Sequence, residues 1–131
     1  MTIAVSAVWA QTEEEVESFA ELAAAALSGE AESQYLLGSS YLRGEGVPDY
    51  ATAAMWHAEA AEQGHADAQF NLGLMYANGD GVPEDDAIAV EWFTKAAEQG
   101  YADAQYRLGI RYEYGEGVPE DDVIAYMWFN L

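Results

Sequence analysis

Cysteine is absent from the 131 residues of this chain, so the sequence has no disulfide framework, no thiol nucleophile and no thiolate metal site. Lysine and arginine number only 4 against 24 aspartates and glutamates, which gives a formal net charge of −20. Phosphate recognition needs clustered basic side chains, so the sequence argues against nucleic acid as a partner. An anionic membrane surface is disfavoured for the same reason. No stretch approaches the roughly 20 apolar residues of a membrane span.

The excess of acidic residues has two interpretations. It keeps a protein soluble, in particular in a salty environment, and it also steers a basic partner toward the surface. The absence of cysteine is compatible with an oxidising or a reducing compartment. Composition alone therefore leaves the partner and the compartment open.

Internal repetition is the strongest pattern in the chain. A segment that begins Leu-Gly and ends Gly-Val-Pro occurs at residues 37–48, 72–83 and 108–119. Three tryptophans, Trp56, Trp92 and Trp128, are spaced 36 residues apart. A period of this size, filled with helix-forming residues, is typical of a helical solenoid, in which each repeat buries its apolar face only against its neighbours.

The unit at residues 65–100 shows how one repeat is built. Ala68, Leu72 and Tyr76 are spaced by four residues and predict one apolar stripe of a first helix. Gly73 lies beside this stripe, although glycine inside a helix costs roughly 1 kcal/mol relative to alanine. Because the glycine recurs in every unit, we expect a large aromatic residue of a neighbouring helix to approach it closely.

A turn and a second helix complete the unit. Gly79 suits a left-handed helix cap, and Pro83 predicts the start of the next element. The acidic run at 84–86 precedes the second helix, where the helix dipole favours negative charge. The second helix extends over residues 87–97 and is closed by Gly100. Each unit is therefore predicted to be a helix–turn–helix pair.

The chain is all-α in this interpretation, an α/α superhelical solenoid of helix–turn–helix repeats. We expect repeat one at residues 30–64, repeat two at 65–100 and a truncated repeat three at 101–131. A half repeat at 12–29 precedes them. Repeat one is one residue shorter, and the deletion falls in its turn, where it is tolerated.

The fixed positions of these units resemble the Sel-1-like repeat family, a relative of the tetratricopeptide repeats. In repeat two the matching residues are Ala66, Ala68, Leu72, Gly73, Tyr76, Gly79, Gly81, Val82, Asp85 or Asp86, Ala89, Trp92, Ala96, Ala97 and Gly100. The resemblance covers about residues 12–131. It implies an adaptor or scaffold for protein complexes, and some similar bacterial members are secreted or periplasmic. One cysteine-rich branch is linked to β-lactam binding, an activity not expected in a chain without cysteine.

The two ends of the chain do not fit the repeat. Residues 1–11 are predicted to be an apolar N-terminal arm or the remnant of a signal peptide. Val8-Trp9-Ala10 resembles the small-residue end of such a peptide, although a basic segment is missing. A periplasmic or secreted location is one expectation and a cytoplasmic location is the other.

Repeat three stops inside its second helix, and a fragment of a longer protein is the simplest explanation. Solenoids usually need a polar capping repeat, so we expect an apolar edge here. The edge is predicted from Leu108, Tyr112, Tyr126, Trp128 and Phe129. Such an edge would permit a homodimer.

A binding surface is predicted on the first helices, which line the concave face in related repeats. The predicted binding residues are Glu32, Tyr35, Ser39, Leu42, Arg43, Asp67, Phe70, Leu74, Asn78, Asp103, Tyr106, Ile110 and Tyr114. Among them Tyr35, Phe70 and Tyr106 form an aromatic ladder on a face that we expect to be solvent-exposed, and exposed aromatic side chains of this kind suit the anchoring of a peptide. The alternative is that these three rings pack along their own solenoid.

The sequence predicts no cofactor, no metal ion and no catalytic residue. The acidic runs lack the spacing of a calcium loop, and His57 and His65 fit no zinc pattern, so surface or helix-terminal roles are expected for both histidines. We therefore expect a non-catalytic scaffold that binds a protein or a peptide. The acidic surface would favour a basic partner. The alternatives are a hydrolase of cell-wall or β-lactam-like substrates and self-assembly through the C-terminal edge.

Overall fold

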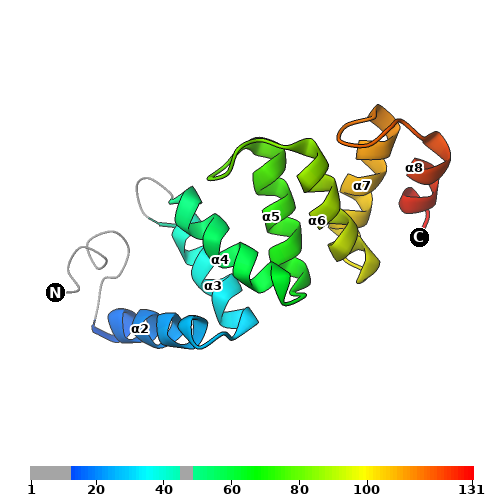
Figure 1. Cartoon of the computed structure of the whole chain (residues 1–131). Helices are drawn as coiled ribbons and strands as arrows, with labels where there is room; N and C mark the ends of the chain where they lie inside the picture. The colour runs from blue at the N-terminus through cyan, green and yellow to red at the C-terminus, as the bar shows by residue number, and fades with distance from the viewer. Residues whose placement is uncertain (1–12, 45–48) are drawn as a thin grey trace.

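The computed structural model of the chain describes residues 13–44 and 49–131, and within them it contains helices and turns but no strand (Figure 1). The helices are α2 (Glu13–Leu27), α3 (Ala31–Leu42), α4 (Tyr50–Glu62), α5 (Ala66–Asn78), α6 (Asp86–Glu98), α7 (Ala102–Tyr114) and α8 (Asp122–Phe129). The predicted all-α class is confirmed. The predicted N-terminal arm, with Val8-Trp9-Ala10, lies outside the described residues, so a secreted location stays a prediction. None of the described helices has the length and apolarity of a membrane span.

The helices form an open row, in which each packs chiefly against its neighbours in sequence. Figure 1 shows α2 and α8 at opposite ends of this row. First helices α3, α5 and α7 alternate with second helices α2, α4, α6 and α8. This one-dimensional packing confirms the predicted solenoid.

Glycine and aspartate form the turns between the two helices of a repeat. Gly79 caps α5 with φ 73°, and Gly115 caps α7 with φ 66°, both in the left-handed region. Asp85 and Asp121 cap the second helices, because their carboxylates accept from the backbone N–H groups three residues later. The acidic runs therefore serve helix N-termini as predicted.

The glycine inside each first helix admits an aromatic ring, which confirms the predicted close approach. A Cβ atom at Gly73 would lie 2.6 Å from Cε1 of Phe93, and one at Gly109 would lie 2.5 Å from Cε1 of Phe129. The corresponding neighbour of Gly38 is the ring of His57, 3.1 Å from the same position. The rings of the second helices thus interlock with the backbones of the first helices.

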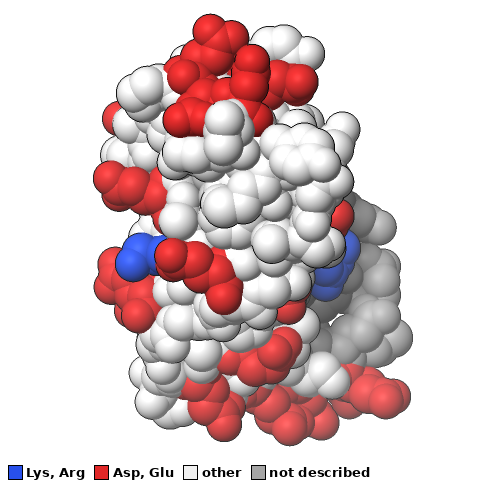
Figure 2. Space-filling view, turned by 90° about the vertical axis from the view of Figure 1, so that its right-hand side faces the viewer, with Lys and Arg blue, Asp and Glu red and all other residues white. Residues whose placement is uncertain are grey.

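The C-terminal edge differs in part from its prediction. The prediction that Leu108 is exposed is wrong, because its side chain is 1% exposed and packs in the core cluster around Phe93. Tyr112 and Trp128 are partly buried against the same cluster, whereas Tyr126 is 70% exposed. Figure 2 views this end of the solenoid and shows acidic side chains along the margins of a largely uncharged surface. The homodimer stays a prediction.

Candidate binding surfaces

The predicted binding residues all lie on the first helices or at their ends, but they differ in exposure. Exposed are Glu32, Arg43, Asn78, Asp103, Tyr106 and Tyr114; partly buried are Tyr35, Leu42, Asp67, Leu74 and Ile110; buried are Ser39 and Phe70. The prediction of a continuous solvent-exposed face is therefore wrong at Ser39 and Phe70. Some of these residues therefore pack between repeats, whereas others are exposed to solvent.

Phe70 is a packing residue at the junction between repeats two and three. Its side chain is 8% exposed, and its ring centroid lies 5.8 Å from that of Phe93 and 5.0 Å from that of Tyr101. Tyr101 immediately precedes α7, so the ring that covers Phe70 comes from the next repeat. The predicted exposure failed because the cover belongs to a neighbouring unit.

The equivalent rings of the other repeats follow the same arrangement. Tyr35 stacks on His65 with centroids 4.7 Å apart and lies 5.5 Å from His57. Tyr106 contacts Phe129 at 5.7 Å but remains 61% exposed. The alternative interpretation of the ladder, packing along its own solenoid, is thus confirmed for Tyr35 and Phe70.

Two acidic residues of the predicted surface also join successive repeats. His65 caps α5, since its Nδ1 accepts from the backbone N–H of Ala68, which leaves Nε2–H to donate to the Glu32 carboxylate at 3.0 Å. In the next repeat Asp67 lies near the hydroxyl of Tyr101. Burial, followed by the interaction with the Asp67 carboxylate, raises the pKa of Tyr101 to about 12. The helix-terminal role predicted for His65 is confirmed.

His57 contradicts its prediction, because it lies in the core and has no surface or helix-terminal role. Its side chain is 0% exposed, and neither ring nitrogen has a hydrogen-bond partner. Burial, assisted by the nearby His65, lowers the pKa of His57 to about 4. The reason is its position in the repeat, because His57 is equivalent to Phe93 of repeat two and Phe129 of repeat three.

One row of first-helix residues is exposed in all three repeats. Arg43, Asn78 and Tyr114 occupy equivalent positions in the repeat sequence, and each is exposed: Asn78 and Tyr114 end α5 and α7, and Arg43 directly follows α3. We call this the first-helix row. Its side chains differ in every repeat, whereas the glycine and leucine of the core stripe stay the same. The row is therefore free of the packing constraints that hold the aromatic ladder.

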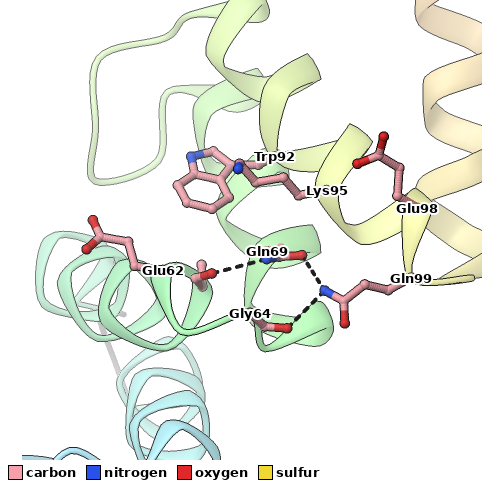
Figure 3. Close-up of a pocket in the computed structure, with 8 residues that line it drawn as sticks. Glu62, Gly64, Gln69, Trp92, Lys95, Glu98 and Gln99 are labelled. Carbon is pink, nitrogen blue, oxygen red and sulfur yellow. Dashed lines mark hydrogen bonds between the residues drawn. The ribbon is translucent and has the colours of Figure 1, made fainter.

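A groove between second helices was not predicted. It lies between α4 and α6, has a volume of about 470 Å³, and is shown in Figure 3. The lining residues are Ala61, Glu62, Gly64, Gln69, Trp92, Lys95, Glu98 and Gln99. The ammonium of Lys95 lies 5.9 Å from the centroid of the Trp92 ring. The groove thus combines an indole, two carboxylates and one ammonium group.

Glutamine side chains form the base of this groove. The amide of Gln99 donates to the Gly64 carbonyl at 2.9 Å and to Oε1 of Gln69 at 2.8 Å. The amide of Gln69 donates to the Ala61 carbonyl at 3.1 Å (Figure 3). These bonds satisfy buried polar groups and hold the two repeats in register.

The same glutamine pair occurs one repeat earlier. The amide of Gln63 donates to Gly29 and Gln34 at 2.9 and 2.8 Å, and Gln34 donates to Ala26 at 3.1 Å. The sequence analysis did not predict these glutamine hydrogen bonds, which we call the glutamine ladder. The recurrence of Gln34, Gln69 and Gln105 at the repeat spacing could have indicated it.

No three histidine, aspartate or glutamate side chains of the described residues come together as a metal site. The buried imidazole of His57 packs against the ring of Tyr35 and the backbone at Gly38. The arrangement offers surfaces for contact with another molecule, namely the first-helix row and the groove.

Comparison with known proteins identifies the repeat. Residues 31–65, 66–101 and 102–131 match the family model of the Sel1 repeat. No curated protein matches the chain. Among solved structures, c5321, described as a protective antigen present in uropathogenic Escherichia coli strains displaying an SLR fold, is 44% identical with a TM-score of 0.80. The match covers 85% of this chain but 24% of that protein, so the chain spans about a quarter of its length.

Two further structures are similar over most of their own length. A Sel1 repeat protein from Oxalobacter formigenes is 36% identical with a TM-score of 0.79, and the match covers 83% of this chain and 84% of that one. Helicobacter pylori cysteine rich protein B is 21% identical with a TM-score of 0.67, covers 85% of both chains, and supports the fold alone. With three matched repeats and a 36% identical relative covered almost throughout, this chain belongs to the Sel1 repeat family.

Proposed function

We propose that this chain is a non-catalytic scaffold that binds a protein or peptide through its first-helix row. Sel1 repeat proteins are commonly protein-interaction scaffolds. The observation that carries the proposal is the contrast between rows of the same helices. Phe70 and Tyr35 are engaged within the solenoid, whereas the first-helix row is exposed in every repeat and carries a different side chain each time.

The row offers three kinds of contact along one surface. Arg43 supplies a charged fork, Asn78 an amide and Tyr114 an aromatic ring with a hydroxyl, and arginine and tyrosine are enriched among residues that dominate binding energy. Because successive first helices repeat at a regular spacing, an extended segment lying across them would meet one side chain per repeat. The first-helix row is therefore suited to recognising successive side chains of an extended partner.

A basic partner fits the electrostatics of the chain. Among the described residues, Asp86 and Glu116 form ion pairs with Arg111, and Glu32 accepts a hydrogen bond from His65. Most of the acidic surface is therefore uncompensated, and it attracts positive charge over several ångströms in low salt. We expect association with the partner to slow as the salt concentration rises.

The test is capture of a partner from lysate, with the variant Arg43→Ala/Asn78→Ala/Tyr114→Ala beside the wild type. The matched control is Met55→Ala/Glu91→Ala/Met127→Ala, which changes one exposed position per repeat on the second helices. The proposal requires a protein retained by the wild type and the control and lost by the row variant. Circular dichroism and thermal unfolding must show that both variants fold. Equal recovery by all three proteins would remove the first-helix row as the binding surface.

A further inference from the structure

We propose that the groove between α4 and α6 binds an arginine side chain of a basic polypeptide, with the guanidinium against Trp92 and between Glu62 and Glu98. This site goes beyond the proposed function, because that function uses the first helices and this groove lies between second helices. The groove is therefore a contact surface separate from the first-helix row.

The groove is preorganised by its base. Gln69 is buried and is fixed by bonds to the Ala61 carbonyl and to Gln99, which itself bonds the Gly64 carbonyl. Gly64 and Gln69 therefore cannot move without breaking the junction between repeats. A hollow of about 470 Å³ held in this way costs little reorganisation when a side chain enters.

Charge decides which side chain fits. Glu62 and Glu98 are exposed, and neither takes part in the ion pairs of the described residues. Their two carboxylates outweigh the single ammonium of Lys95, so the groove favours a cation. A guanidinium stacks on an aromatic face and also offers a fork of N–H donors to carboxylates, which an ammonium cannot do in one plane.

Lys95 shows that the indole already accepts a cation. Its ammonium lies 5.9 Å from the centroid of Trp92, within the range of a cation–π contact. In repeat one the equivalent of Lys95 is Glu59, so the repeat does not need a lysine here for packing. Lys95 thus acts as an internal competitor for an arginine, and its removal should strengthen binding.

The test is a titration of the full chain with an acetylated and amidated Gly-Arg-Gly-Arg-Gly peptide at physiological salt. The readout is the indole N–H resonance of Trp92, assigned with Trp92→Phe. The same peptide with citrulline in place of arginine keeps the shape and removes the charge. We expect the arginine peptide to shift the Trp92 resonance in a saturable manner and the citrulline peptide to leave it in place.

Two pairs of variants separate the groove from general attraction. Glu62→Gln/Glu98→Gln should weaken binding about three- to tenfold, whereas Glu84→Gln/Glu120→Gln, with the same change of charge on distant turns, should change it less than twofold, since distant exposed charges are screened at this salt. Lys95→Gln should tighten binding by about twofold or more, and Arg107→Gln, which removes an exposed cation on α7, should not.

Some outcomes would overturn the proposal. They are equal weakening by the two glutamate pairs, weaker binding by Lys95→Gln, and an equal response to the citrulline peptide. Far-ultraviolet circular dichroism of each variant excludes unfolding as the cause. The experiment shares no probe and no variant with the lysate capture, so the groove and the first-helix row can fail separately.

Discussion

Replacing His57 with phenylalanine should stabilise the protein. His57 occupies the site of Phe93 and Phe129, and it buries two ring nitrogens that have no hydrogen-bond partner. A buried polar group without a partner costs about 1 to 3 kcal/mol, which His57→Phe removes. A phenyl ring fits beside the glycine of a first helix, as Phe93 does beside Gly73. We therefore expect the free energy of unfolding to rise by about 1 to 3 kcal/mol at neutral pH.

The gain should grow as the pH falls. Burial lowers the pKa of His57 from 6.5 to about 4, so the unfolded chain takes up a proton below pH 6.5 while the folded protein stays neutral. The unfolded state then binds more protons, and the free energy of unfolding decreases between pH 6.5 and 4. This contribution amounts to roughly 2 kcal/mol at pH 5 and is absent in His57→Phe.

The assay is urea unfolding followed by circular dichroism at about pH 7.5 and pH 5, for the wild type and His57→Phe. The reciprocal variant Phe93→His is the control, because it should destabilise repeat two and add the same pH dependence there. The reasoning is refuted if His57→Phe is no more stable than the wild type at the higher pH. It is equally refuted if both proteins lose the same stability on going to the lower pH.

Three more variants test the packing. Gly73→Ala should lower the free energy of unfolding by about 1 to 3 kcal/mol, because the new Cβ would collide with the Phe93 ring, and thermal unfolding measures the loss. Phe70→Ala should lower the free energy of unfolding by about 3 to 5 kcal/mol, because it leaves a cavity at the repeat junction. Tyr114→Ala, at an exposed position, should change it by no more than about 0.5 kcal/mol in denaturant unfolding. Equal losses of stability would contradict the distinction between buried packing residues and the exposed first-helix row. Gln69→Ala should cost about 1 to 3 kcal/mol and speed amide exchange at α4 and α5, since the Ala61 carbonyl loses one of its donors and the Gln99 amide loses the Gln69 acceptor.

Much of the fold could be predicted because each repeat is built from local rules. The spacing of Ala68, Leu72 and Tyr76 predicts a helix, and Gly79 and Asp85 predict where the helices end and begin. Since every helix packs chiefly against its neighbours in sequence, the order of the elements also sets their contacts. No long-range pairing had to be guessed.

The exposure of the aromatic ladder could not be predicted in the same way. A helical period separates the two faces of one helix, but it does not say which residue of the next repeat covers a face. Phe70 is covered by Tyr101, which lies 31 positions further along the chain and just outside α7. Whether such a ring is buried depends on the angle between repeats, which the sequence pattern does not contain.

The burial of His57 and the hydrogen bonds between glutamines were missed for a different reason. Both could have been predicted from a comparison of equivalent positions in the three repeats. Aligning the repeats places His57 with Phe93 and Phe129, positions at which an aromatic ring packs against the glycine of a first helix; His57 and Phe93 are fully buried, whereas Phe129 at the end of the row is 39% exposed. A histidine judged by its type is expected at the surface, whereas a histidine judged by its register belongs to the core. In a repeat protein the equivalent position is the stronger guide, since equivalent residues meet equivalent neighbours.

The same logic separates the residues that hold the solenoid from those that are free to bind. The glycine that recurs at 38, 73 and 109 is buried against a neighbouring second helix in every repeat. The first-helix row changes from arginine to asparagine to tyrosine while the sequence motif around it repeats. In the groove, Trp92 keeps the type of Trp56 whereas Lys95 replaces Glu59. Variation on a constant framework lets one fold present different side chains at a regular spacing, which is the property that a scaffold for an extended partner requires.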